Sequence, residues 1–175
     1  IAPDLEQAGA KTILWSLDRA LRYAPMNALW DGQRFALERW AMAVFTPASK
    51  ARLKDEPQRD WRVLALGVTS EHPPFPALPA VADELGGIVR TEAAGPIIGV
   101  LPGLKALDGQ FTKDFLIQQL TRRWPVVHLA SHFSFQPGDK DESYLLLGDG
   151  GRLTVGELER LPNLFQGVDL LTLSA

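Results

Sequence analysis

Short, continuous apolar runs alternate with segments of helical spacing from residue 61 onward. The run 61–68 is rich in valine and leucine, the segment 112–123 carries its apolar residues at helical spacing, and the apolar run 126–131 follows closely. Strands that are apolar along their whole length and are connected through helices are typical of parallel sheets buried on both faces. This alternation predicts an α/β fold with a mainly parallel sheet flanked by helices.

Proline, glycine and capping residues mark the ends of the expected elements. Gly86 and Gly87 would end one helix, because glycine suits the residue that follows a helix. Thr154 and Glu157 have the spacing of a capping box before another helix. We expect strands over 61–68, 88–91, 126–131 and 168–173, helices over 78–86, 112–123 and 155–161, and a hairpin made of 144–147 and 152–154.

The first sixty residues have a different rhythm. Two short strand-like runs, 11–15 and 20–23, are separated by a four-residue turn and predict a β-hairpin. A helical turn over 25–29 follows. The segment 35–44 comes next, and its spacing fits a strand or a helix equally well. We therefore expect a hairpin-containing N-terminal extension.

A polar stretch over 46–60 separates this extension from the apolar runs. It predicts a connector between an N-terminal part, 1–60, and an α/β core, 61–175. The chain has 175 residues and a mass of 19.2 kDa, which suits one structural domain overall. It begins at Ile1 without an initiating methionine, and we expect it to be a piece of a longer protein.

Charge and composition remove several classes of function. Lys and Arg number 18 against 21 Asp and Glu, for a net charge of -3, whereas nucleic-acid-binding modules have a basic face. The longest apolar runs are far shorter than the roughly 20 residues of a membrane-spanning helix. With no cysteine the chain has no disulfide, no thiolate metal site and no cysteine nucleophile of its own. No targeting segment is present, so the cytoplasm is the expected compartment.

The chain has three histidines, His72, His128 and His132. His128 lies inside an expected strand and His132 at its carboxyl edge, four residues on, so extended backbone would point both to the same side of the sheet. Catalytic groups of open α/β sheets gather at that edge. His132 is therefore the candidate general base, and His128 is expected to be a core histidine with its hydrogen bonds satisfied. Ser131 and Ser174 are nearby, but neither lies in a G-x-S-x-G nucleophile elbow.

Four segments of the second half follow an order found in a known family. On them, and on 21–29 (LRYAPMNAL) with Asp31 and Gly32 after it, the chain from about residue 11 to residue 175 resembles the CHAT domain. This is a caspase-like and separase-like module that is often attached to tetratricopeptide repeats. The four segments are 126–132 (VVHLASH), 142–150 (ESYLLLGDG), 153–158 (LTVGEL) and 169–175 (DLLTLSA).

The resemblance implies a caspase-like α/β fold and hydrolysis of peptide bonds by a His–Cys dyad. The histidine that ends the Ala-Ser-His motif is His132, and the cysteine is expected directly after Ala175. The cysteine thiolate would attack the peptide carbonyl, and His132 would polarise the thiol and protonate the leaving amine. The implied partners are a protein or peptide substrate and a tetratricopeptide-repeat domain, attached or separate, in a bacterial-type peptidase. No cofactor and no metal are expected.

Other residues receive roles from the same resemblance. Phe133 stands where many relatives have glycine after the histidine, and its backbone N–H would help to hold the oxyanion. Glu71 and His72, in the loop after the first strand of the core, would contribute to a substrate pocket. His128, Ser174 and Ala175 would lie near the active edge.

Two other functions remain open. A catalytically inactive CHAT-fold pseudo-peptidase would act as a binding or regulatory module, and the absence of cysteine from these residues favours it. A metal-dependent hydrolase would use His128 and His132, although the segment lacks the glutamate of an H-E-x-x-H site and no third ligand is indicated.

Overall fold

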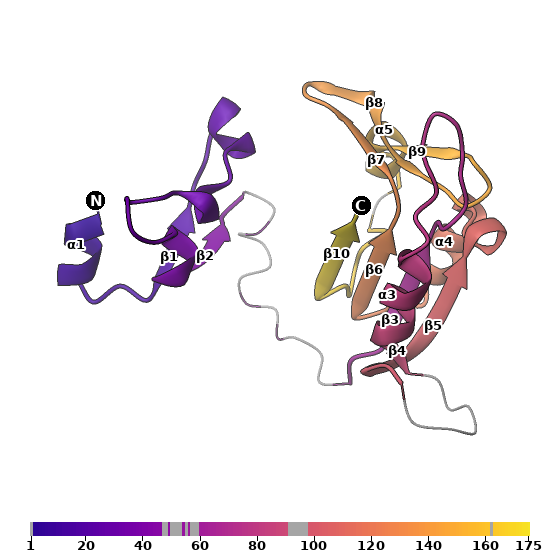
Figure 1. Ribbon diagram of the computed structural model, residues 1–175, viewed down its shortest axis with the longest axis horizontal. Coiled ribbons are helices and arrows are strands. Elements are labelled where there is room, and N and C mark those ends of the chain that lie inside the picture. Colours follow the sequence, from indigo (N-terminus) through magenta and orange to yellow (C-terminus); the bar gives the residue numbers. More distant parts are fainter. Residues whose placement is uncertain are drawn as a thin grey trace. The chain divides into compact units, whose positions relative to one another are not determined.

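The computed structural model describes residues 2–46, 49, 54, 56, 60–90, 98–161 and 163–175. The chain forms two compact units, Ile1–Glu56 and Pro57–Ala175 (Figure 1). Most of the expected connector, 46–60, lies outside the described residues, and so does Thr91 at the end of the expected strand 88–91. Of the helices described, none combines the length and the apolar character that a membrane span requires.

The first unit is built around a two-stranded sheet, and the hairpin expected here is wrong. Strand β1 pairs with β2 in parallel, with Thr12 opposite Ala41, so these strands cannot be joined by a tight turn. The run 20–23 belongs to a 3-10 turn instead, because the Asp18 carboxylate accepts a hydrogen bond from the Arg19 N–H and caps it. The elements are α1 (Ala2–Gln7), β1 (Thr12–Trp15), η1 (Arg19–Tyr23), η2 (Met26–Ala28), η3 (Ala36–Glu38) and β2 (Ala41–Val44).

The second unit contains a five-stranded sheet in which every pairing is parallel. Its strand order is β10-β6-β3-β5-β4, and Figure 1 shows these strands running in one direction. This confirms the expected α/β architecture with a mainly parallel sheet. The strands are β3 (Val63–Gly67), β4 (Val89–Arg90), β5 (Leu101–Leu107), β6 (Val126–Ala130) and β10 (Leu170–Ser174).

Alternate residues of the central strands pack on opposite faces of the sheet. On β3, Val63 and Ala65 join Val81 and Leu85 of helix α3 (Val81–Ile88) in one cluster. The residues between them, Leu64 and Leu66, pack with α4 (Lys113–Leu120) in the larger cluster. All five β3 residues are buried, which is why this strand is a continuous apolar run rather than an alternating one.

A second, antiparallel sheet extends from the carboxyl end of β6. Its order is β7-β8-β9, and the expected hairpin of 144–147 with 152–154 is its β8–β9 part. The capping box is also confirmed, since Thr154 and Glu157 bond each other's backbone N–H groups at the start of α5. The elements are β7 (Phe133–Gln136), β8 (Asp139–Leu146), β9 (Arg152–Thr154) and α5 (Val155–Glu159).

One expected helix end differs from the structure, and two strands were not expected. Helix α3 continues through Gly86 and Gly87 to Ile88, because two glycines cost only about 1 kcal/mol each in a helix that Leu85 anchors in the core. Strands β5 and β7 were not expected as strands, although β5 is central to the sheet. Short 3-10 turns at η3 and η4 (Asp108–Gln110) complete the described elements.

Candidate active site

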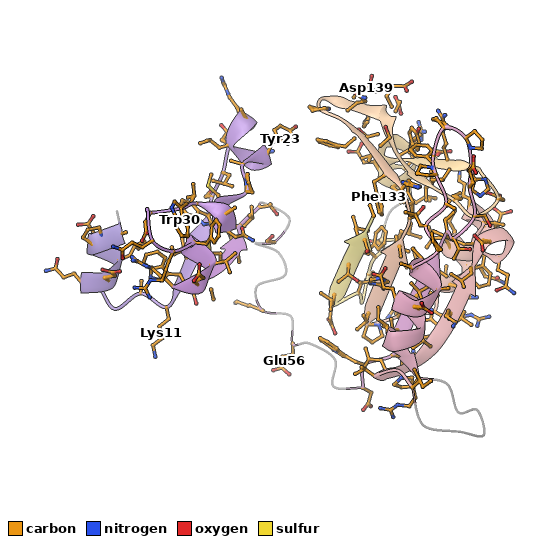
Figure 2. The ribbon with its side chains drawn as sticks, viewed as in Figure 1. Lys11, Tyr23, Trp30, Glu56, Phe133 and Asp139 are labelled. Carbon is orange, nitrogen blue, oxygen red and sulfur yellow. The ribbon has the colours of Figure 1, made fainter. Side chains whose placement is uncertain are left out.

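The candidate site lies where the parallel strands β3, β5, β6 and β10 end. Parallel strands deliver the residues that follow them to one edge of the sheet. This edge receives the loop 68–80 after β3, Asp108 after β5, Ser131 and His132 after β6, and Ala175 after β10. Figure 2 shows Phe133 where the chain leaves β6 for the β7–β8 hairpin, with Asp139 at the far end of that hairpin.

His132 is half-buried and is held on two sides by the loop after β3. Its Nε2 lies 2.8 Å from the Pro76 carbonyl oxygen. A carbonyl only accepts, so Nε2 carries the hydrogen and Nδ1 is the nitrogen free to take a proton. The Phe75 ring stacks on the imidazole, with centroids 4.9 Å apart and an interplanar angle of 28°. This leaves a histidine with a fixed ring plane and a defined basic nitrogen.

The aromatic contact continues beyond Phe75. The Tyr144 ring meets Phe75 edge-on at 6.3 Å, and the Arg152 guanidinium lies 4.5 Å from the Tyr144 ring centroid. Arg152 and Tyr144 come from β9 and β8. The antiparallel sheet therefore supports the outer side of the same stack that holds His132.

The end of β10 lies beside the start of the His132 segment. In the parallel register, Leu173 is opposite Leu129 and Ser174 is opposite Ala130. The pairing extends one step further, because the Ser131 N–H donates to the Ser174 carbonyl at 2.9 Å. The Ser131 hydroxyl is fully buried and donates to the Leu146 carbonyl at 2.7 Å. Ser131 thus serves packing at this edge, whereas β10 brings Ser174 and Ala175 to it.

His128 is in a different environment, in the middle of β6. It is 7% exposed, its Nδ1 lies 2.6 Å from the Thr172 hydroxyl and its Nε2 lies 2.9 Å from a Glu84 carboxylate oxygen. Both ring nitrogens have partners, as expected of a core histidine. The residue links β6 to β10 on one side and to α3 on the other.

The two histidines do not share a ligand arrangement. Strand β6 ends at Ala130, before the alternation could carry His132 to the His128 side, and the contacts of each ring are to different residues. Within the described ranges there is no group of three His, Cys, Asp or Glu side chains that could hold a metal ion.

The residues expected to line the substrate side are placed as follows. Phe133 opens β7 opposite Leu145, in extended backbone that phenylalanine adopts without strain. Glu71 is exposed, whereas His72 is half-buried with its Nε2 buried and unpartnered among the described residues. His72 also closes a small backbone bridge with Phe75. The oxyanion role of Phe133 and the pocket role of Glu71 and His72 stay predictions.

Sequence reasoning missed two features of this edge, the Phe75–Pro76 contact and Asp108. The Asp108 carboxylate accepts hydrogen bonds from the backbone N–H groups of Thr69 and Ser70, at 2.7 and 2.9 Å, and from the Thr69 hydroxyl. Partial burial raises its pKa, but these bonds lower it by more, so the pKa lies below the ordinary 3.8. An aspartate directly after a strand was the available signal, and it was lost because β5 was not expected.

A comparison with known protein families places the chain in one of them. The family model described as CHAT domain matches residues 1–175, the whole chain. No curated protein and no solved structure matches.

Proposed function

The chain belongs to the CHAT domain family, which is related to caspase-like peptidases, and on that premise we propose that it hydrolyses peptide bonds with His132 as general base. The nucleophile is a cysteine directly after Ala175. The observation that carries this proposal is the hydrogen bond from His132 Nε2 to the Pro76 carbonyl, which directs Nδ1 to act as the base. The substrate is a protein or peptide, and the family resemblance adds a tetratricopeptide-repeat domain, attached or separate, as a partner.

The register of the sheet supports the position of the nucleophile. Ser174 pairs with Ala130 and its carbonyl accepts the Ser131 N–H, so β10 delivers the residue after Ala175 to the edge of the sheet where His132 lies. A thiol delivered to that edge would share it with the imidazole. Adjacent strands would thus bring together a base and a nucleophile that are far apart in the sequence, as this kind of catalysis requires.

The chemistry follows from this placement. His132 Nδ1 takes the thiol proton, and the Pro76 carbonyl stabilises the resulting imidazolium through the Nε2 hydrogen. The sulfur bonds to the peptide carbonyl carbon and the C=O electrons move to oxygen. When the oxyanion collapses the C–N bond breaks, and the imidazolium gives its proton to the leaving amine. Water then cleaves the thioester, with His132 again taking the proton.

A binding or regulatory module is the second candidate, favoured by the absence of cysteine from these 175 residues. Iodoacetamide labelling of the full-length protein, with peptide mapping, separates the two. We expect one rapidly labelled thiol directly after Ala175, and a His132→Ala variant in which both its labelling rate near neutral pH and peptide cleavage fall. The binding module would be supported if the full-length protein binds peptides without cleaving them and if His132→Ala leaves the rate of thiol labelling unchanged.

A further inference from the structure

The loop 69–78 is the structure that holds His132, and it is closed upon itself. Its two ends meet where the Leu78 N–H donates to the Thr69 carbonyl at 3.0 Å. Within it, His72 and Phe75 exchange backbone hydrogen bonds of 3.1 and 2.8 Å. Two residues near the end of this loop, Phe75 and Pro76, contact the His132 ring. Their position therefore depends on how the base of the loop is fixed.

Asp108 fixes that base from the neighbouring strand. Strand β5 runs parallel to β3 with Leu107 opposite Gly67, so Asp108 arrives beside the first residues of the loop. Its carboxylate accepts two backbone N–H groups and one hydroxyl, from Thr69 and Ser70. Charge-assisted hydrogen bonds of this kind are about twice as strong as neutral ones.

The backbone of Asp108 is itself set in an unusual conformation. Its φ is +48°, in the left-handed region that an aspartate tolerates better than most residues. A Cβ on Gly148 would collide with the Asp108 carbonyl, so the turn after β8 packs directly against this residue. The Gly148 N–H donates to the Phe111 carbonyl at 2.9 Å, on the same turn after β5. The position of Asp108 is thus fixed by its own backbone conformation and by its contact with the turn after β8.

We propose that Asp108 is a positioning residue for His132, acting through the loop 69–78. The proposal rests on the catalytic role of His132 given above. The Asp108 carboxylate fixes Thr69 and Ser70, Thr69 fixes Leu78, and the adjacent Phe75 and Pro76 set the ring plane and the tautomer of His132. Removing the carboxylate lets the Pro76 carbonyl move away from Nε2, and the imidazole then divides between its two neutral tautomers.

The direct test is the tautomer of His132, read from imidazole ¹⁵N chemical shifts in the full-length protein. We expect the native protein to show His132 protonated at Nε2, and Asp108→Ala to show a mixture of tautomers. Asp108→Asn keeps one acceptor oxygen for the two N–H groups and is expected to restore most of the native shift. Asp114→Ala removes an exposed acid in the first turn of α4 and is the matched control.

Activity gives the second readout. A displaced general base lowers kcat, by up to about 100-fold for a shift near 1 Å, and Asp108→Asn should recover most of it. If Asp108→Ala does not fold, Thr69→Val, which removes only the hydroxyl bond, takes its place with a smaller tautomer shift. A folded Asp108→Ala with unchanged His132 shifts overturns the positioning role. A tautomer shift in a protein without peptidase activity keeps that role and overturns the proposed function instead.

Discussion

The middle of strand β6 and its carboxyl end each place a histidine, in very different environments. In the middle, His128 is buried and both ring nitrogens are engaged by side chains, Thr172 and Glu84. At the end, His132 is half-buried, and a backbone carbonyl engages Nε2 while Phe75 covers one face of the ring. The same side chain therefore links the sheet to its neighbours at one position and, under the proposed function, transfers a proton four residues later.

The difference teaches that the environment, rather than the residue type, separates structure from chemistry. A histidine whose two ring nitrogens are both engaged by side chains in the interior has no nitrogen left for a reactant. A histidine whose tautomer is set by a backbone carbonyl keeps the second nitrogen for a reactant. The comparison would fail if His132→Ala mainly lowered stability while His128→Ala mainly lowered peptide cleavage.

The largest expected effect is on activity at the carboxyl end. His132→Ala should lower peptide cleavage by the full-length protein by about 10²–10⁴-fold, the usual contribution of a general acid–base group. The free energy of unfolding should change little, since the ring is half-buried at the sheet edge. Kinetics with a peptide library and chemical denaturation provide the two measurements. A large loss of stability together with retained cleavage would assign His132 to the core.

The next effect is on stability in the middle of the strand. His128→Ala leaves Glu84 and Thr172 without this partner and should lower the free energy of unfolding by about 1–3 kcal/mol. Cleavage by the fraction that remains folded should be close to native. Denaturant titration measures the first quantity and kinetics below the transition measures the second. Loss of cleavage in a stably folded His128→Ala protein would show that the middle of β6 takes part in the chemistry.

Much of the fold could be predicted because the buried strands are recognisable in the sequence as apolar runs. Runs such as 61–68 and 126–131 are mostly apolar because both faces of the sheet are covered. Strand β5 could not be recognised in this way, since Pro102, Gly103 and Lys105 interrupt it. Gly103 passes so close to the Val63 carbonyl that a Cβ would collide. The glycine that hides the strand in the sequence is the residue that lets β5 approach β3.

The candidate site likewise contains one residue that the sequence predicts and two partners that it does not. His132 could be predicted because its place at the end of an apolar run is visible in the sequence. Its partner, the Pro76 carbonyl, lies 56 residues away along the chain and is a backbone group that any residue could supply. Asp108 was hidden with β5. Contacts made by backbone atoms, or across unrecognised strands, leave no pattern in residue types.

A smaller effect should follow when the ring that covers His132 is reduced. Phe75→Leu removes the aromatic stack and should lower the free energy of unfolding by about 0.5–1.5 kcal/mol. The His132 ring proton resonances should shift downfield, because the ring current of Phe75 is lost. Phe115→Leu, which shrinks a phenylalanine packed against the core cluster, is the control and should leave those resonances in place. Unshifted His132 resonances in Phe75→Leu would contradict the stack.

The smallest expected effect is the response to acid of the sheet edge that holds His132. It sharpens the comparison because Asp108, which directly follows β5, lies at this edge. Its pKa lies below 3.8 in the folded protein. The ionised form is therefore favoured by folding, and its contribution to stability is complete above pH 3.8 and is lost as the pH falls through the folded pKa. The Thr69 and Ser70 amide ¹H resonances, whose protons the carboxylate accepts, should titrate with a midpoint below 3.8. Asp108→Asn should abolish the transition. A midpoint at or above 3.8 would mean that partial burial outweighs the hydrogen bonds, and the loop that holds His132 would then lack its charged anchor near that pH.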